Sequence, residues 1–265
     1  MLTNIAQRWR GGRAVYRPAG TAINPRRYEV APIAGDAEAR EFVTSHHYSG
    51  SYPAARERVG LYRGGALVGV AVFSVPVQGK VLDALPCPRA FAVELGRLVL
   101  LDDVEANGES WFIARAFDHL RRRGFAGVIS FADPEPRRAA DGRLIFPGHI
   151  GGIYQATNAI YAGRSTPRTL RLLPSGAVVS ARTLQKIRAR DRGWRYGVDQ
   201  LVAAGAAPPA GSDLRAWLAA ELPRITRTMQ HRGCHRYLFG LHPAVRRKLT
   251  GLPHLPYPKL EIPRL

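Results

Sequence analysis

Residues 91–101 read FAVELGRLVLL, an apolar stretch whose only charged residues are Glu94 and Arg97. Its length and its bulky apolar side chains predict a buried β-strand. Residues 109–122 (ESWFIARAFDHLRR) then repeat apolar side chains at helical spacing, and residues 128–132 (VISFA) form a second short apolar run. A strand, a helix and a strand in this order predict a sheet with helices packed against it.

The same rules extend this pattern in both directions along the chain. A hairpin is expected where Arg63-Gly64-Gly65 separates two runs rich in β-forming residues. The other elements are predicted from apolar alternation or from a period of about 3.6 residues. The expected strands are 28–33, 59–62, 67–75, 170–173, 177–179 and 236–241, and the expected helices are 37–46, 152–161 and 181–190, with one more around Trp217.

The composition divides the chain into three regions. Residues 1–27 carry six arginines among Gly and Pro, which predicts a basic arm that touches phosphates, although a solvated tail has the same composition. Residues 28–167 hold the α/β pattern and are the expected catalytic core. Residues 168–265 are less regular, and we expect a basic C-terminal extension packed on the core.

The chain is strongly basic, with 39 Lys and Arg against 20 Asp and Glu, a net charge of +19 and a pI of about 11.0. A surface of this charge binds nucleic acid, because neutralised phosphates release counterions. The basic residues are scattered rather than gathered on one amphipathic helix, which argues against a membrane surface as partner. No apolar run could span a bilayer and the first residues lack the apolar segment of a signal peptide, so we expect a cytoplasmic protein. Cys87 and Cys234 are expected to be reduced core thiols.

Polar groups recur at the ends of the apolar elements or inside them. Burial of such groups without a task is costly, so their order along the chain indicates a functional pocket. The clusters are SHHYSGS (45–51), ELGRL (94–98), SFADP (130–134), PGH (147–149) and YQATNAIY (154–161).

These clusters carry a resemblance to a known family. The runs HHYSGS, ELGRLVL, ESWFIARAF, GVISFADP, PGHIGGIYQATNAIYAGRS, LQKIRAR and HRYLF resemble, in this order, the Mom family of phage adenine-modification proteins. The resemblance implies a GNAT-like acyltransferase fold, an α/β (α+β) fold with a mixed central sheet and flanking helices. It also implies that adenine in double-stranded DNA is converted to N6-carbamoylmethyladenine, which protects phage DNA from restriction in the host cytoplasm.

Three residues fit the GNAT comparison locally. In that fold the helix after the fifth strand often carries an Asn followed by a Tyr that acts as general acid, and Asn158 and Tyr161 match this pattern. Glu94 lies on the expected fourth strand, where some members of the fold place a general base. The glycine-rich loop that binds the pyrophosphate of coenzyme A has no counterpart, because the corresponding stretch LDDVEANGES is acidic and holds one Gly. This absence argues against acetyl-CoA as the acyl donor.

Glycyl-tRNA is a donor that would account for the product. Glycyl transfer to adenine N6 gives an isomer of carbamoylmethyladenine. The glycyl amine could then attack C6 through a five-membered ring and expel the amide nitrogen, without redox chemistry. A basic surface would serve both tRNA and DNA.

In this scheme Tyr161 protonates the leaving group or holds the carbonyl oxygen, and Glu94 or Asp133 takes the proton from the attacking amine. Ser130 and Tyr48 orient the donor and the base. An extruded adenine stacks on Tyr48 or Tyr154. Each side chain also has a structural interpretation, as a core aromatic, an ion-pair partner or a turn cap. The remaining expected substrate-binding residues are His46, His47, Arg97, Tyr154 and Asn158.

The sequence assigns no metal site, but it contains the ligand types of a two-histidine, one-carboxylate iron site. His46, His47, Asp133 and His149 could supply its ligands. His46 and His47 are adjacent, so on a helix their side chains diverge by about 100° and one ion would hardly use both.

Basic residues near the C-terminal end are candidate DNA contacts. Contacts to phosphate position a duplex and carry little sequence information, so a loose site preference is expected. These candidates are Arg182, Lys186, Arg190, Arg246, Arg247 and Lys248.

Two alternative functions stay open at this point. A noncatalytic DNA-binding or packaging protein would need only the net charge of +19. A CoA-dependent N-acetyltransferase acting on a small or protein amine would need the pyrophosphate loop that the sequence lacks. A binding protein has no need of polar residues inside apolar strands, which favours the enzyme.

Overall fold

The computed structural model describes residues 5–10, 13–18, 21–253 and 255–259, with side chains from residue 21 onward. Backbone contacts divide the chain into two units. Unit 1 comprises residues 1–134, 149–165 and 234–265, and unit 2 comprises residues 135–148 and 166–233. Among the described helices, none combines the length and the hydropathy needed to cross a membrane.

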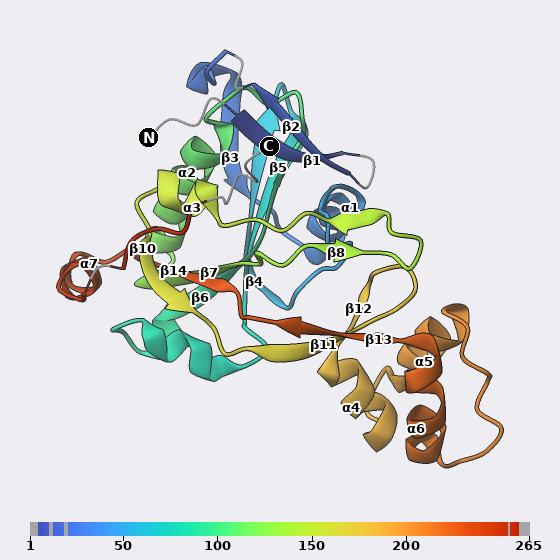
Figure 1. The fold of residues 1–265 in the computed structure, drawn as a ribbon. Coiled ribbons are helices and arrows are strands. Elements are labelled where there is room, and N and C mark those ends of the chain that lie inside the picture. Colours follow the sequence, from blue (N-terminus) through green and yellow to red (C-terminus); the bar gives the residue numbers. More distant parts are fainter. Residues whose placement is uncertain (1–4, 11–12, 19–20, 254, 260–265) are drawn as a thin grey trace. The chain divides into compact units, whose positions relative to one another are not determined.

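Unit 1 is built on a seven-stranded sheet with the strand order β10-β14-β7-β6-β5-β4-β3 (Figure 1). Neighbouring strands are antiparallel except β6 and β7, which are parallel, so the expected mixed sheet with flanking helices is confirmed. The elements of this unit are β1 (Ile5–Arg10), β2 (Arg13–Pro18), η1 (Pro25–Arg27), β3 (Tyr28–Pro32), α1 (Asp36–His46), β4 (Ala55–Arg63), β5 (Ala66–Ser74), η2 (Gly79–Ala84), η3 (Arg89–Phe91), β6 (Ala92–Leu100), α2 (Gly108–Arg122), β7 (Gly127–Ala132), α3 (Gly152–Ala156), β10 (Ile160–Arg164), β14 (His235–Gly240) and α7 (Pro243–Thr250).

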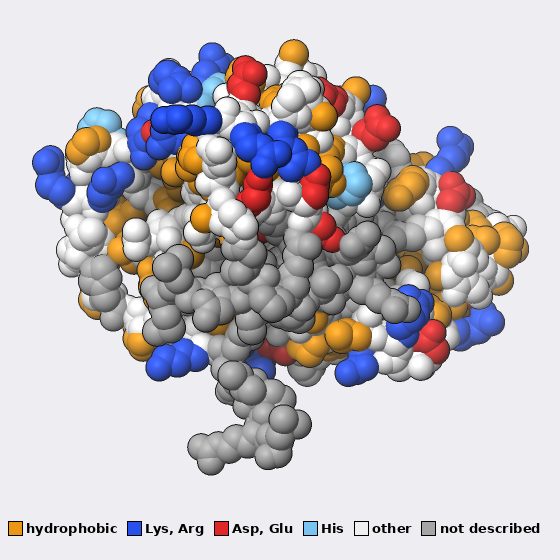
Figure 2. All heavy atoms as spheres, turned by 90° about the horizontal axis from the view of Figure 1, so that it is seen from above, with side chains coloured by type: hydrophobic (Ala, Val, Ile, Leu, Met, Phe, Trp, Pro, Cys, Tyr) orange, Lys and Arg blue, Asp and Glu red, His pale blue; other side chains and the backbone are white. Residues whose placement is uncertain are grey.

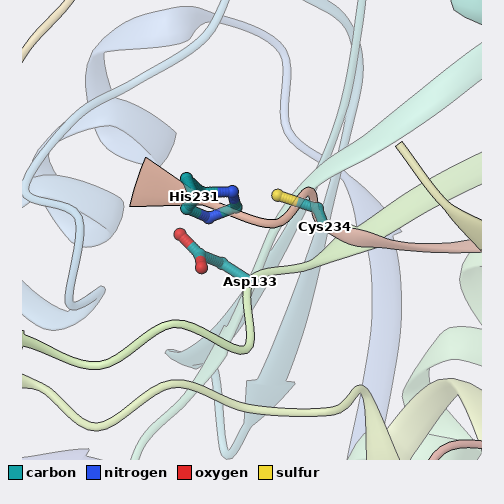
Figure 3. Close-up of side chains that lie close together, drawn as sticks. All are labelled: Asp133, His231 and Cys234. Carbon is teal, nitrogen blue, oxygen red and sulfur yellow. The ribbon is translucent and has the colours of Figure 1, made fainter. Parts of the chain in front are cut away.

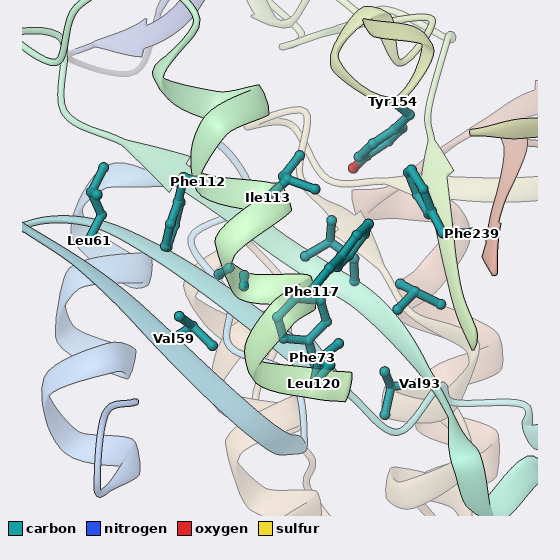
Figure 4. Packing of buried hydrophobic residues seen from close by; sticks show 14 of the residues in the cluster. Val59, Leu61, Phe73, Val93, Phe112, Ile113, Phe117, Leu120, Tyr154 and Phe239 are labelled. Carbon is teal, nitrogen blue, oxygen red and sulfur yellow. The ribbon is translucent and has the colours of Figure 1, made fainter. Parts of the chain in front are cut away.

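Helices α1 and α2 cover opposite faces of the sheet. Phe112 and Phe117 of α2 pack with Phe73 of β5 in the largest apolar cluster (Figure 4). Val43 of α1 packs with Val72, the residue before Phe73, in a separate cluster. Successive side chains of a strand point to opposite faces, so β5 supplies one apolar row to each helix. This explains why β5 reads as a continuous apolar run rather than an alternating one.

The expected helix over residues 152–161 is wrong in its second half. Helix α3 ends at Ala156, and Asn158 adopts a left-handed conformation with φ of 58°. A left-handed residue cannot continue a right-handed helix. The chain then enters β10, so Tyr161 lies on a strand.

The C-terminal region differs from the expected extension. Strand β14 inserts between β7 and β10 and pairs with both, and α7 follows it within unit 1. Residues 234–265 therefore belong to the unit that carries the main sheet. This pairing joins segments about a hundred residues apart, which local sequence patterns do not reveal.

The N-terminal region was expected to be an extended arm, and part of it instead forms a hairpin. Strands β1 and β2 pair antiparallel over residues 5–10 and 13–18. The basic residues Arg26 and Arg27 lie in the short helix η1, which precedes β3.

Unit 2 holds two small sheets and three helices. Its elements are β8 (Arg137–Arg138), β9 (Leu144–Phe146), β11 (Arg168–Leu172), β12 (Val178–Val179), α4 (Ala181–Ala189), α5 (Trp194–Ala203), α6 (Leu214–Ile225) and β13 (Arg227–His231). The three helices share a core in which Ile187, Leu201 and Leu218 are almost completely buried. Unit 2 thus has its own apolar core.

Candidate functional site

A β-bulge on β6 brings two charged side chains to the same face of the main sheet. Val72 of β5 pairs with Arg97, and the next residue, Phe73, pairs with Leu95, so Gly96 is the extra residue on β6. One extra residue shifts the alternation by one position, and side chains three apart then share a face. Glu94 and Arg97 therefore project from one side of the strand.

Packing on the other face of β6 supports this assignment. Val93 and Leu95 before the bulge, and Leu98 and Leu100 after it, all contact the cluster that contains α2. Glu94 lies between the first two and so projects from the opposite face.

Gly96 permits the close approach that this bulge requires. A Cβ atom on residue 96 would lie 2.4 Å from Ser74 Oγ and 3.4 Å from Pro53 Cγ. Ser74 is itself buried on the neighbouring strand. Gly96 in ELGRL is thus a local requirement of the backbone.

Arg97 holds the loop that follows α1. Its Nε donates to Ser51 O at 2.9 Å, its Nη2 donates to Ser51 Oγ at 2.7 Å and its Nη1 donates to Gly96 O at 2.6 Å. A guanidinium group that donates from three nitrogens fixes both its own position and that of the loop.

A directional chain of hydrogen bonds continues from Arg97 to His47. Ser51 Oγ donates to Ser49 Oγ at 3.2 Å, and Ser49 Oγ lies 2.9 Å from His47 Nδ1. The backbone N–H of Ser49 also donates to His47 Nδ1, at 3.1 Å. Since Nδ1 accepts a hydrogen bond from a group that can only donate, the proton of the neutral ring resides on Nε2.

Burial lowers the pKa of His47 to about 3, and the charges of Arg97 and His149 contribute. The ring is therefore neutral at physiological pH. The Tyr48 ring lies 4.1 Å from that of His47 and 6.1 Å from that of His149, between ring centroids. The loop after α1 thus presents an aromatic ring beside two imidazoles.

Glu94 is a partly desolvated carboxyl group. Burial raises its pKa, and the charge of Arg97 opposes the rise. Burial also lowers the pKa of Arg97, with Tyr48 and Glu94 acting against that change. A carboxyl group whose pKa is raised by burial binds a proton more readily, which suits it to proton transfer.

Ser130 and Tyr154 belong to the same electrostatic environment. Burial raises the pKa of Tyr154, and a hydrogen bond with the Ser130 side chain acts in the opposite direction. The charges of Glu94 and Arg97 also affect the Tyr154 hydroxyl. Ser130 Oγ donates to Leu95 O at 3.2 Å.

The parallel strands β6 and β7 pair over only three positions. The last pair is Glu94 with Ile129, although β6 continues to Leu100 and β7 continues to Ala132. Glu94 therefore stands where the pairing between the two strands ends, and Ser130 is the next residue on β7.

The structure brings together six of the ten predicted catalytic and substrate-binding residues. We call them the Glu94 cluster, and its members are His47, Tyr48, Glu94, Arg97, Ser130 and Tyr154. Ser49 and Ser51 complete it and were not predicted. The hydroxyl-rich run YSGS was a signal for them, because short side chains next to a histidine often bond to its ring or to backbone.

Tyr161 lies apart from this cluster. Its hydroxyl is 2.8 Å from His235 Nδ1 on the neighbouring strand β14. Tyr237 stands between the two predicted tyrosines, with ring centroids 5.3 Å from Tyr154 and 5.5 Å from Tyr161. The general-acid role expected for Tyr161 rested on a helical position that it does not have.

The other three predicted residues lie in different settings. Asp133 follows β7 beside Cys234, which precedes β14 (Figure 3), and its backbone oxygen accepts from His149 N at 2.8 Å. His46 is exposed on the last turn of α1, 4.8 Å from the Phe42 ring. Asn158 is exposed at its left-handed turn.

Asn158 lines a cavity of about 530 Å³ within unit 1. Helix α2 contributes Ile113 and Phe117 to its walls, and β14 contributes Phe239. No member of the Glu94 cluster lines it. The cavity and the cluster are therefore distinct features of unit 1.

The four candidate residues do not form the two-histidine, one-carboxylate iron site. Among the described residues, the ligand atoms of His46, His47, Asp133 and His149 do not gather into a group of metal-binding size. His47 Nδ1 already accepts hydrogen bonds from Ser49, which leaves Nε2 as its one remaining nitrogen.

The predicted DNA contacts are spread over two helices. Arg182 and Lys186 lie one turn apart on α4, but Arg190 is the left-handed residue that ends this helix, and its side chain donates to Ser212 O. Arg190 therefore does not continue the helical spacing of Arg182 and Lys186. Arg246, Arg247 and Lys248 are exposed on α7.

Comparison with known proteins gives one family and several weak structural similarities. The profile of the Mom protein family matches residues 27–259. An N-acetyltransferase from Staphylococcus aureus Mu50 is 10% identical, with a TM-score of 0.36 over 81% of this chain and 99% of that chain. A tandem GNAT protein from the clavulanic acid biosynthesis pathway is 10% identical, with a TM-score of 0.41 over 82% and 99%. The ribosomal-protein-S18-alanine N-acetyltransferase from Escherichia coli is 12% identical, with a TM-score of 0.33 over 53% and 81%. No curated protein matches the chain.

Proposed function

Because this chain belongs to the Mom protein family, we propose that it is an acyltransferase-like enzyme that modifies adenine in double-stranded DNA. The proposed product is N6-carbamoylmethyladenine, which would protect phage DNA from restriction. The observation that carries the proposal is the Glu94–Arg97 pair, which the bulge at Gly96 turns to one face where β6 and β7 stop pairing. Burying part of a carboxyl group is costly because it loses hydration, and among the described side chains no ion pair joins Glu94 to Arg97 in return, so a role in chemistry is favoured for Glu94.

Glu94 is the proposed general base. Its raised pKa matches the task of taking a proton from the attacking exocyclic amine of adenine. Arg97 positions the loop after α1 through Ser51, and its charge opposes the rise in the pKa of Glu94 and so favours the carboxylate form that accepts a proton. We assign proton transfer to the pair as one unit.

The loop after α1 is the proposed site for the extruded base. Tyr48 offers a ring on which a purine can stack, and the neutral His47 offers its Nε2–H as a hydrogen-bond donor. On the other side of the strands, Tyr154 and Ser130 are proposed to orient the acyl donor.

The proposed donor is a glycyl ester, as in glycyl-tRNA. Adenine N6 would attack the ester carbonyl, one N6 proton would pass to Glu94, and the tRNA hydroxyl would leave with that proton. The glycyl amine would then add to C6 to form a five-membered ring. Cleavage of the original C6–N6 bond, with one proton passing from the added amine to N6, would leave N6 as the nitrogen of a primary amide. These steps balance without an oxidant or a reductant.

The charge distribution supports a nucleic-acid substrate. Unit 2 has 15 basic against 6 acidic residues in its 82 residues, a net charge of +9, and unit 1 has 24 against 14 in 183, a net charge of +10. Figure 2 shows Lys and Arg side chains spread over the face that it draws, with acidic side chains beside some of them. Binding that rests on such charge falls steeply with salt.

The test is mass spectrometry of nucleosides from DNA of cells that express the protein. We expect the modified adenosine with the wild-type chain and with Glu29→Gln, an exposed control, and a loss of at least about 100-fold with Glu94→Gln. Purified protein given DNA with labelled glycyl-tRNA or labelled acetyl-CoA identifies the donor by the label that enters adenine. Unmodified DNA with the wild-type chain would leave the noncatalytic DNA-binding alternative, which the net charge alone supports. If label from acetyl-CoA enters adenine instead, the donor is acetyl-CoA and the glycyl donor is wrong.

A further inference from the structure

An exposed aromatic side chain stands among arginines at the start of α5, within unit 2. Tyr196 is 76% exposed, the second largest value among the exposed large apolar side chains of the described residues. Exposed tyrosines in a basic setting are typical of surfaces that stack on bases.

Trp194, two residues earlier on α5, points away from Tyr196, because residues two apart on a helix do not share a face. The Arg195 guanidinium carbon lies 5.1 Å from the centroid of the Trp194 ring, and that of Arg190 lies 6.0 Å from it. Trp194 is partly buried against the core of unit 2, so its ring is anchored on one side. The Trp194 ring thus anchors the start of α5 and has the guanidinium groups of Arg190 and Arg195 over it.

The charges around these rings are largely uncompensated. Among the described side chains, Arg188, Arg192 and Arg195 form no ion pair, and all three are exposed. Nearby carboxyl groups are limited to Asp191 and Asp199 along residues 188–199. A polyanion would therefore be attracted to this surface.

The first turn of α5 adds a second feature that favours phosphate. Gly193 precedes the helix with φ of 83°, no side chain caps the helix, and its first turn holds no acidic residue. The N–H groups of a helical first turn have no partner within the helix, and the helix dipole favours an anion there. Arg195 lies in the same turn.

We propose that residues 188–196 form a stacking surface for an unpaired strand of nucleic acid, which we call the Tyr196 surface. A base stacks on Tyr196, and phosphates contact Arg192, Arg195 and the start of α5. A duplex keeps its bases stacked on each other and offers no free base face, so the surface selects single strands. The proposed contacts are to base faces and phosphates, which DNA and RNA share, so strands of equal length should bind alike.

The proposal is tested by fluorescence anisotropy with labelled oligonucleotides. The probes are a 12-nucleotide oligo-dT, the matching oligo-U and a 12-base-pair duplex, each titrated with the full chain. We expect Tyr196→Ala to weaken binding of both single strands by about 5- to 150-fold, the factor for 1–3 kcal/mol per stacked base. Tyr196→Phe keeps the ring and should bind like the wild type.

Two controls separate stacking from charge and from general damage. Phe91→Ala removes another exposed aromatic, in unit 1, and should leave single-strand affinity unchanged. Arg195→Gln should make the salt dependence shallower, by about 0.7 in the slope of log K against log salt. Circular dichroism of each variant checks that it is folded.

The proposal is overturned if Tyr196→Ala binds single strands like the wild type, or if it weakens the duplex by the same factor. It is also overturned if Tyr196→Phe is as weak as Tyr196→Ala. Adenine modification in duplex DNA, measured in the same variants, reports separately on the Glu94 cluster, so the two proposals can fail independently.

Discussion

Gly96→Ala is the substitution that most directly tests the bulge on β6. The added Cβ would lie 2.4 Å from Ser74 Oγ, about 1 Å inside an ordinary contact distance. Ser74 is 1% exposed, so it has little room to move away. Overpacking of this kind costs about 1–3 kcal/mol of unfolding free energy. For a chain of this size each kcal/mol lowers Tm by about 2–4 °C.

A second substitution should compensate for the lost stability of Gly96→Ala. Ser74→Ala removes the atom at 2.4 Å, and the remaining neighbours of the new Cβ, Pro53 Cγ and residue 74 Cβ, lie at 3.4 Å. The double variant should therefore regain most of the stability, with a coupling energy of about 1–3 kcal/mol between the two sites. Urea unfolding of the wild type, both single variants and the double variant gives this cycle.

Activity follows from the same geometry. If the crowded bulge moves Arg97 away from Ser51, adenine modification should fall in Gly96→Ala and recover with Ser74→Ala. A Gly96→Ala variant as stable and as active as the wild type would refute the assignment of Gly96 as a close-approach residue. Destabilisation that Ser74→Ala fails to relieve would refute the contact as its cause.

Other substitutions test the cluster and its surroundings. The acid limb of the pH–rate profile should lie above the ordinary glutamate pKa of about 4.3, because burial raises the pKa of Glu94; a limb at or below that value would exclude Glu94 as the base. Tyr154→Phe should lower the modification rate by about 10-fold or more, as expected when one hydrogen bond to a reacting group is lost. Tyr161→Phe should change the rate less than about 3-fold in the same assay. The reverse order would assign the general acid to Tyr161. Burial is the largest single influence on the pKa of Glu57 and raises it, but the hydrogen bonds and charges of His119 and Arg123 together lower the pKa below its ordinary value. Glu57 therefore stabilises the fold above its unfolded pKa and loses this contribution as pH falls through the lower folded value. Glu57→Gln should thus reduce the unfolding free energy by about 1–2 kcal/mol at pH 7, with the difference from wild type vanishing at acid pH; an equal deficit at pH 3 and pH 7 would contradict this.

Much of the main sheet could be predicted from local patterns. Strand β6 and helix α2 were placed to within one or two residues, because a long apolar run and a strong 3.6-residue period are the clearest signals in a sequence. The hairpin of β4 and β5 followed from Gly64-Gly65. Such signals are contained within a few residues of each other.

The misplaced elements depend on distant partners or on a single backbone angle. The position of β14 inside the sheet is set by pairing with β7 and β10, and nothing in residues 235–240 specifies those partners. The end of α3 depends on the left-handed Asn158, a conformation that Asn adopts more readily than most residues but does not require.

The candidate site was predicted in part for a physical reason. Charged or polar residues inside apolar strands, such as Glu94, Arg97 and Ser130, stand out in any sequence because their burial is costly. The bond from Arg97 to Ser51 could not be foreseen, since it joins residues 46 positions apart. Tyr161 was assigned by analogy with a helix, and the backbone there is a strand.

The late position of β14 in the chain has a consequence for synthesis. As the ribosome extends the polypeptide, β7 and β10 emerge long before the strand that joins them, and all of residues 166–233 must follow first. During that interval β7 has a bare edge in the middle of a future sheet, which is a template for pairing with other chains. Unit 2 has its own core and can fold before the sheet of unit 1 is complete. A stop codon placed between residues 233 and 240 would therefore give a folded unit 2 attached to an incomplete, aggregation-prone sheet.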